Sequence, residues 1–105
     1  VGSSMVKTAR TQISMLETGL DAYRLDLGRY PSTEEGLRAL VDKNESPSWE
    51  GPYLRKQVPL DPWGREYQYR SPGEHGPFDL FSLGADGALG GEGEDADVVN
   101  WESKP

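Results

Sequence analysis

The stretch Val6–Gly28, VKTARTQISMLETGLDAYRLDLG, decides the fold of this 105-residue chain. Its apolar side chains recur at alternating spacings of three and four residues, which is the spacing of one face of an α-helix. Gly28 is suited to a left-handed helix cap, and Pro31 prevents continuation. We therefore predict an amphipathic helix over residues 5–27, in a register that also permits continuation upstream. Its apolar face consists of Val6, Ala9, Ile13, Leu16, Leu20, Tyr23 and Leu27.

Downstream of this helix, the pattern changes to short strands. Ser32 and Glu35 have the spacing of a capping box, which predicts a short second helix over residues 33–42. Alternating polar and apolar residues predict strands over 66–70 and 78–83, with a third at 53–58 or 98–101. A long helix followed by a small antiparallel sheet is an α+β fold. The length and the absence of repeats predict one domain over residues 1–105, in which 53–101 form the sheet and an acidic loop.

Composition argues against several classes of function. The formal net charge of −7 disfavours a nucleic-acid-binding protein, and a chain without cysteine has no disulfide framework or thiolate metal site. No stretch approaches the ~18 consecutive apolar residues of a membrane span. The one histidine, His75, lies in a Gly- and Pro-rich segment typical of a solvated side chain. Glu34 and Glu35 are adjacent carboxylates, but a capping role explains them better than a catalytic carboxylate pair does. We predict that the chain is not an enzyme.

The negative charge is concentrated in the last third of the chain. Residues 1–70 contain ten basic and ten acidic side chains, whereas residues 71–103 contain eight acidic and no basic ones. Residues 83–97, LGADGALGGEGEDAD, hold five acids and five glycines. A solvated or disordered acidic loop is one interpretation. The other is a calcium site, because docked flanks would hold the acids together, no basic residue is near in sequence, and glycines let carbonyls turn toward an ion.

A series of short motifs over residues 9–101 resembles one protein family. Their order and spacing are similar to those of the major (G-type) pseudopilins of bacterial type II secretion systems. Two departures from the family pattern, Leu27 and Glu35, lie at helix ends. The motifs are Tyr23-Arg24-Leu25-Asp26, Gly28-Arg29-Tyr30-Pro31, Thr33-Glu34-Glu35-Gly36-Leu37, Asp61-Pro62-Trp63-Gly64, Gly76-Pro77-Phe78-Asp79-Leu80, Ser82-Leu83-Gly84-Ala85-Asp86-Gly87 and Ala96-Asp97-Val98.

This resemblance implies a pilin-like fold, in which a long amino-terminal helix packs on a small antiparallel sheet. It implies a structural subunit that assembles helically into a periplasmic pseudopilus, together with minor pseudopilins and inner-membrane components of the secretion system. A very apolar helix upstream of the present chain would anchor the full-length subunit in the inner membrane. The alternative is a calcium-dependent binding module, such as an adhesin domain or a minor pilin.

The resemblance also favours calcium over a merely solvated loop and implies its ligands. The carbonyl of Leu83 and the carboxylates of Asp86 and Asp97 match the family's site, and Asp95 and the carbonyl of Ala88 are further candidates. Separately, the helical pattern leaves several charged side chains off the apolar face. We expect four of them to face neighbouring subunits, namely Arg10, Glu17, Asp21 and Arg24.

Overall fold

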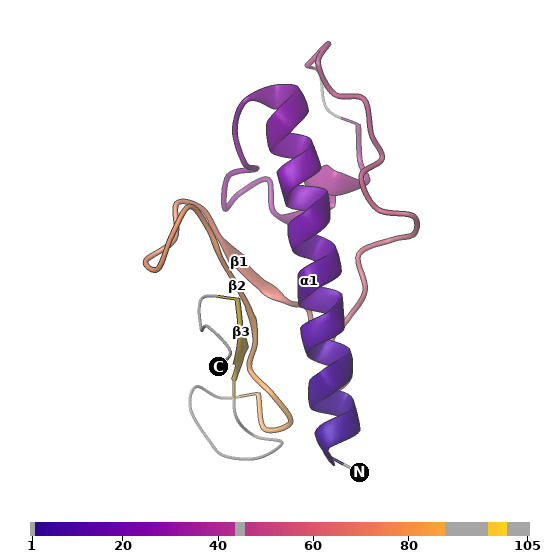
Figure 1. The fold of residues 1–105 in the computed structure, drawn as a ribbon, viewed down its shortest axis with the longest axis vertical. Helices are drawn as coiled ribbons and strands as arrows, with labels where there is room; N and C mark the ends of the chain where they lie inside the picture. Colours follow the sequence, from indigo (N-terminus) through magenta and orange to yellow (C-terminus); the bar gives the residue numbers. More distant parts are fainter. Residues whose placement is uncertain (1, 44–45, 88–96, 101–105) are drawn as a thin grey trace.

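A long helix, α1 (Gly2–Leu27), forms one layer of the molecule in the computed structural model, which describes residues 2–43, 46–87 and 97–100 (Figure 1). The apolar face expected from the sequence is the face that the helix buries: Ala9, Leu16, Leu20 and Tyr23 are fully buried. The helix ends as predicted, because Gly28 has a φ of 82° and its N–H donates to the carbonyl of Arg24 at 2.7 Å. It begins three residues earlier than predicted.

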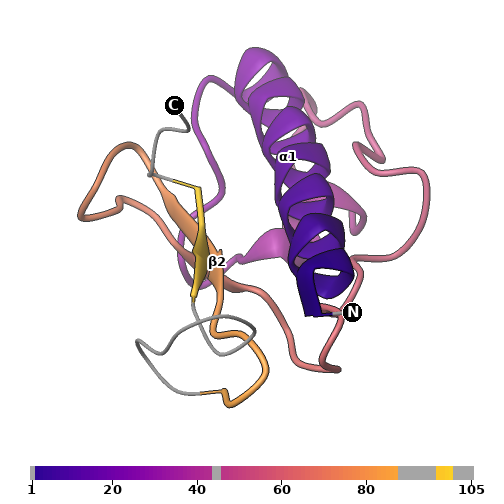
Figure 2. The same ribbon diagram turned by 60° about the horizontal axis from the view of Figure 1, so that its bottom comes forward.

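The second layer is an antiparallel sheet of three short strands in the order β1-β2-β3. They are β1 (Gln68–Arg70), β2 (Asp79–Ser82) and β3 (Val98–Val99). The sheet lies on one side of α1, and the connection over residues 46–60 runs along the other side (Figures 1 and 2). These positions confirm the predicted α+β class. The shared core contains side chains from both layers, including Leu16, Leu20, Tyr67, Phe78, Leu80 and Val98.

Gly19 explains how the long connection approaches the helix so closely. A Cβ added at this position would lie 3.0 Å from Cδ2 of Leu54 and 3.2 Å from the carbonyl oxygen of Tyr53. A glycine in a helix interior costs about 0.5–1 kcal/mol relative to alanine. Here it provides the space in which the connection packs against α1. A hydrogen bond also joins the connection to the helix, because the hydroxyl of Tyr53 donates to Asp26 at 2.7 Å.

The predicted short helix over 33–42 is wrong in extent. The capping box itself forms: the N–H of Ser32 donates to Oε1 of Glu35 at 2.8 Å, and the N–H of Glu35 donates to Oγ of Ser32 at 3.1 Å. However, Gly36 adopts a φ of 66°, which ends the turn at once. The only helical residues that follow in the described part of this segment form one 3₁₀ turn, η1 (Leu37–Leu40). The third strand is β3, and residues 53–58 form no strand.

The ion pair between Arg29 and Glu35 should make stability depend on pH. Hydrogen bonds from the Arg29 guanidinium and the N–H of Ser32 lower the pKa of Glu35 from 4.5 to about 2. Because this folded-state pKa is depressed, the stabilisation is complete above the unfolded-state pKa and is lost as pH falls toward the folded-state pKa. The pair is partly exposed, so we expect only about 0.5–1 kcal/mol.

The measurement is urea unfolding of the wild type and Glu35→Gln between about pH 5 and pH 2. The wild type should lose more stability than the variant over this range, because only the wild type carries the carboxylate. Equal losses in the two proteins would contradict the lowered pKa of Glu35.

Candidate functional site

The pairing of β2 with β3 brings the two ends of the acidic loop together. Phe81 pairs with Val99 and Ser82 with Val98, so Leu83 and Asp97 occupy the next opposite positions at the mouth of the loop. Both residues are half-buried, and Oδ1 of Asp97 is shielded from solvent. Two of the three ligands implied by the resemblance are therefore adjacent across a pair of strands, although they are far apart in sequence.

A tight turn over residues 84–87 carries the third of these ligands, Asp86, which is exposed. The N–H of Gly87 donates to the carbonyl of Gly84 at 3.3 Å, and these glycines have φ values of 67° and 80°. Both lie in the left-handed region, which glycine occupies without the steric cost of a Cβ. Gly84 and Gly87 thus determine the direction of the chain just after β2, through the left-handed conformation that the turn requires.

Asp61 ties this turn to a second turn elsewhere in the sequence, and it was not among the predicted site residues. Its side chain is buried and accepts three hydrogen bonds. Oδ1 accepts from the N–H groups of Trp63 at 3.0 Å and Arg65 at 2.9 Å, and Oδ2 accepts from Oγ of Ser82 at 2.7 Å. Oγ of Ser82 in turn accepts from the N–H of Gly84 at 3.1 Å. The sequence signal was Asp at the first position of a Pro-containing turn.

A basic side chain does lie beside the acidic loop, contrary to what sequence proximity suggested. Nη1 of Arg65 donates to the carbonyl oxygens of Gly84 at 2.9 Å and Ala85 at 3.4 Å. Arg65 follows the turn that begins at Asp61, and the hydrogen bonds of Asp61 bring that turn next to β2. The turn at the start of the acidic loop is therefore contacted by a positively charged side chain that is 19 positions away in the sequence.

The ligands predicted at and near the two ends of the loop are oxygen donors, the kind that a hard cation takes. They are the carboxylates of Asp86 and Asp97 and the carbonyl of Leu83, and calcium takes oxygen ligands of these two kinds in flexible geometry. Within residues 2–43, 46–87 and 97–100, no three His, Cys, Asp or Glu side chains form a group that could hold a metal ion. The remaining predicted ligands, Asp95 and Ala88, lie outside the described residues.

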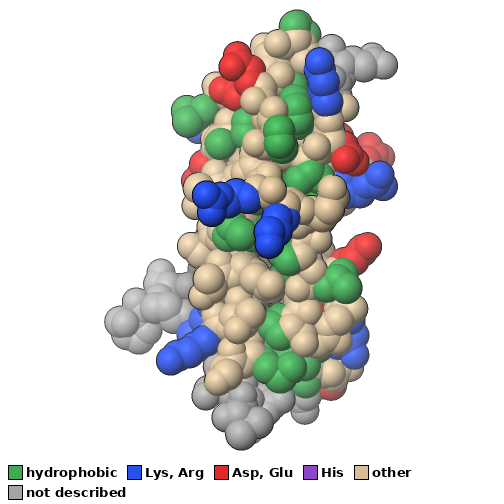
Figure 3. Space-filling model, turned by 90° about the vertical axis from the view of Figure 1, so that its right-hand side faces the viewer, with side chains coloured by type: hydrophobic (Ala, Val, Ile, Leu, Met, Phe, Trp, Pro, Cys, Tyr) green, Lys and Arg blue, Asp and Glu red, His purple; other side chains and the backbone are tan. Residues whose placement is uncertain are grey.

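The four charged residues expected to face neighbouring subunits do not share one environment. Arg10, Asp21 and Arg24 are exposed, whereas Glu17 is half-buried. The hydroxyl of Tyr30 donates to Oδ1 of Asp21 at 2.9 Å, and the Arg24 guanidinium lies 5.7 Å from the centre of the Tyr30 ring. Two of the four residues therefore contact Tyr30 within the subunit. Figure 3 shows the side away from the sheet, where hydrophobic side chains are scattered and not gathered in one large patch.

Glu17 is attached to the last strand of the sheet through Asn100. Nδ2 of Asn100 donates to Oε2 of Glu17 at 3.3 Å, while the backbone N–H of Leu80 donates to Oδ1 of Asn100 at 2.7 Å. Burial raises the pKa of Glu17, and its hydrogen bond to Asn100 partly opposes that shift. One side chain thus links helix α1, strand β2 and the residue that follows β3.

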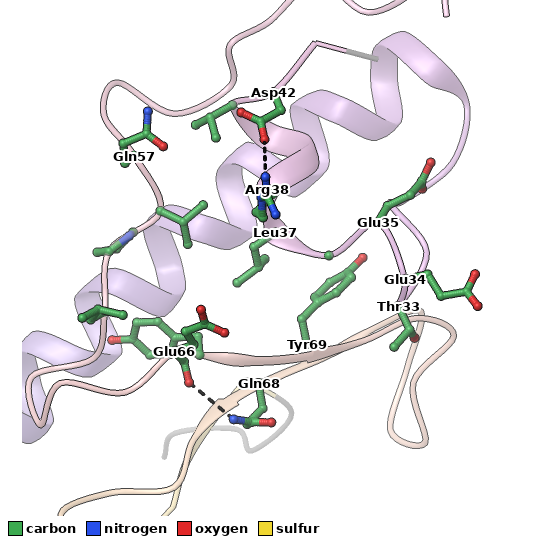
Figure 4. A pocket seen from close by; sticks show the side chains of 16 residues that line it. Thr33, Glu34, Glu35, Leu37, Arg38, Asp42, Gln57, Glu66, Gln68 and Tyr69 are labelled. Atoms are coloured by element: carbon green, nitrogen blue, oxygen red, sulfur yellow. Dashed lines mark hydrogen bonds and ion pairs between the residues drawn. The ribbon is translucent and has the colours of Figure 1, made fainter. Parts of the chain in front are cut away.

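One groove of the molecule has no catalytic arrangement among its described lining residues. It lies between residues 33–42 and strand β1, with a volume of about 560 Å³ (Figure 4). Two of its carboxylates are paired, Glu35 with Arg29 at 2.7 Å and Asp42 with Arg38 at 3.4 Å. The hydroxyl of Thr33 donates to the carbonyl of Ser71. None of the described lining residues combines a nucleophile with a base, which is the minimum for covalent catalysis.

His75 does not complete such an arrangement elsewhere. The sequence suggested a solvated side chain, but the imidazole contacts Asp79, with 3.3 Å between its Nδ1 and Oδ2 of Asp79. Asp79 is buried and also accepts from the N–H groups of Glu74 and His75. Burial raises the pKa of Asp79, but these hydrogen bonds outweigh it and leave the pKa below its ordinary value. The pair fixes the connection between β1 and β2.

A model of the family described as "Type II secretion system (T2SS), protein G" matches residues 1–101. The chain belongs to this family. Its members are structural pseudopilins, which confirms the prediction that the chain is not an enzyme and identifies it with a structural subunit of type II secretion. No helix in the described part of this protein G chain is long and apolar enough to cross a membrane.

Relatives of known identity agree with this assignment. The chain is 49% identical over 102 residues to the type II secretion system core protein G of Pseudomonas aeruginosa, covering 93% of this chain and 72% of the relative. It is 53% identical over 97 residues to the core protein G of Vibrio cholerae, covering 89% of this chain and 66% of the relative. The chain therefore spans about two thirds of the length of these protein G relatives.

A solved structure gives the same fold. The crystal structure of the major pseudopilin from the type 2 secretion system of enterohaemorrhagic Escherichia coli matches with a TM-score of 0.78 and 39% identity. The match covers 94% of this chain and 88% of that one. The pilin-like arrangement predicted from the protein G motifs, a long helix packed on a small antiparallel sheet, is therefore confirmed.

Proposed function

We propose that the protein is the major subunit of a type II secretion pseudopilus, that it assembles helically in the periplasm, and that calcium stabilises its carboxy-terminal loop. Family membership supports the role as a subunit. The observation that carries the calcium proposal is the register of β2 and β3, which sets Leu83 opposite Asp97 at the mouth of the loop. Asp86, on the turn that follows Leu83, supplies a second carboxylate to the same end of the molecule.

The proposed ion would close the loop from its two ends. The Leu83 carbonyl and the carboxylates of Asp86 and Asp97 would hold it, with Asp95 and the carbonyl of Ala88 as the further predicted ligands. Bound calcium supplies positive charge that offsets the repulsion among these carboxylates. Because only the folded chain presents the ligands together, binding would stabilise the folded state by mass action. A site outside the cytoplasm can work with a Kd of about 10⁻⁴–10⁻³ M.

Assembly would use the charged face of helix α1. We propose that Arg10, Glu17, Asp21 and Arg24 meet neighbouring subunits in the fibre, and that minor pseudopilins and inner-membrane secretion components are the other partners. An apolar segment upstream of the present chain would anchor the subunit in the inner membrane. The match covers 72% and 66% of the length of two protein G relatives, so these relatives contain further residues outside the matched part.

Removing the charge of Asp21 should impair fibre formation without changing the fold. Asp21→Asn keeps a side-chain oxygen that can accept from the hydroxyl of Tyr30, so the contact within the subunit survives. The control is Glu34→Gln, which removes the same charge from an exposed position outside α1. Fibres are counted by electron microscopy in cells that express the secretion system, with melting temperatures of the purified chains measured in parallel.

We expect fewer fibres with Asp21→Asn and wild-type numbers with Glu34→Gln, at unchanged melting temperatures. Wild-type fibre numbers for Asp21→Asn would show that this charge is merely solvated. Such a result would remove Asp21 from the assembly surface and leave the family assignment untouched.

A further inference from the structure

Arg65 places a positive charge against the first turn of the acidic loop. Its Nη1 donates to the carbonyl oxygens of Gly84 and Ala85, at 2.9 Å and 3.4 Å. The guanidinium also lies close to Gly87, where an added Cβ would come within 2.6 Å of its Cζ and Nε. A single side chain thus contacts three of the four residues of the turn that carries Asp86.

The backbone of Arg65 is itself held firmly. Its N–H donates to Oδ1 of Asp61 at 2.9 Å, and its carbonyl accepts from the N–H of Asp61 at 2.7 Å. Asp61 is buried and also accepts from Ser82 at the end of β2. The guanidinium therefore extends toward the turn from a backbone that is itself held in place by hydrogen bonds.

We propose that Arg65 is a built-in counter-cation of the acidic loop: it keeps the 84–87 turn folded when calcium is absent, and its charge lowers the affinity for calcium. This inference rests on the calcium site proposed above.

The charge of Arg65 favours the calcium-free form of the loop and disfavours the calcium-bound form. Without calcium, the positive charge offsets the repulsion among the carboxylates of the loop and stabilises the turn. With calcium bound, the same charge lies near a divalent cation and repels it. Arg65 therefore stabilises the calcium-free form more than the calcium-bound form. Since the side chain is partly exposed and screened by salt, we expect its removal to raise calcium affinity by about threefold to tenfold at low ionic strength.

The test compares Arg65→Gln with Arg55→Gln. Arg55 is exposed on the connection that runs along the other side of α1, so its substitution removes the same charge away from the loop. Melting temperatures are measured in chelator and in saturating calcium, and calcium affinity by calorimetry in low and high salt. Arg65→Gln should melt below Arg55→Gln in chelator, gain more from calcium, and bind the ion more tightly, with the gain in affinity shrinking at high salt.

Arg65→Lys separates charge from hydrogen-bond geometry, because it keeps the charge but cannot reproduce the contact of a planar guanidinium. Its calcium affinity should stay near that of the wild type. A calcium affinity of Arg65→Gln equal to that of Arg55→Gln would overturn the inference, as would equal losses of melting temperature in chelator and in calcium. If the wild type itself shows no calcium response, the proposed calcium site is wrong and the inference falls with it, a result distinct from the previous two.

Discussion

Replacing Asp97 with alanine should remove most of the rise in melting temperature that calcium gives the wild type. At free calcium about 100 times Kd, binding to the folded state alone stabilises it by about 2.7 kcal/mol. For a domain of this size, that corresponds to roughly 10–20 °C. Asp97 is opposite Leu83 at the mouth of the loop, so its loss removes one end of the proposed site.

The measurement is thermal unfolding in calcium and in chelator. The melting temperature of Asp97→Ala in calcium should approach that of the wild type in chelator, and Asp86→Ala should behave likewise. Chelator should then have little further effect on either variant. Glu94→Ala, an acid of the same loop that is not among the predicted ligands, is the control and should respond as the wild type does. Magnesium should substitute poorly, because it prefers octahedral geometry and retains its waters.

A wild-type melting temperature that is indifferent both to chelator and to added calcium would refute the calcium site. The loop would then be only an acidic surface segment. A full calcium response in Asp97→Ala would retain the ion but exclude this ligand.

Replacing Asp61 with alanine should be the most damaging single change to the folded state among those proposed for the described residues. The substitution leaves the N–H groups of Trp63 and Arg65 and the hydroxyl of Ser82 without their acceptor in a buried environment. Each buried donor left unsatisfied costs about 1–3 kcal/mol, so we expect a loss of roughly 3–5 kcal/mol in the free energy of unfolding. Asp61→Asn keeps one acceptor oxygen and should lose less.

Urea unfolding in chelator measures this loss without any contribution from calcium. The matched control is Asp26→Ala, which removes an exposed carboxylate that accepts from the hydroxyl of Tyr53, and it should cost no more than about 1 kcal/mol. If Asp61→Ala is no less stable than Asp26→Ala, then Asp61 does not hold the two turns together.

The elements predicted best from the sequence are those governed by local periodicity. The face of α1 from Ala9 to Tyr23 is buried as its spacing indicates, and Gly28 caps the helix, because both features depend on neighbouring residues alone. The error at residues 33–42 has a local cause as well. The capping box formed by Ser32 and Glu35 was recognised, but the left-handed conformation of Gly36 was not, and it limits the helix to one 3₁₀ turn.

The ends of the candidate site could be proposed from the sequence, and their role as calcium ligands stays a prediction. The acidic, glycine-rich pattern draws attention to the loop, and the family resemblance assigns Leu83, Asp86 and Asp97 as its ligands. Arg65 carries no such signal, since its relation to the loop depends on the buried hydrogen bonds of Asp61 with Ser82. The order of charges along the chain therefore does not indicate that Arg65 lies beside the acidic loop, because only the tertiary fold brings them together.

The hydrogen bond between Asn100 and Glu17 joins residues that are 83 positions apart. Helix α1 precedes the segment that carries Asn100 along the chain, so it is synthesised before that segment. Contacts of such long range require the closure of a large loop of chain, so they follow local ones in folding. The part of α1 around Glu17 therefore reaches its final surface only after β3 and Asn100 have been added. A subunit shortened before β3 would lack this contact and would therefore differ from a finished one on the very helix that we propose for neighbour contacts.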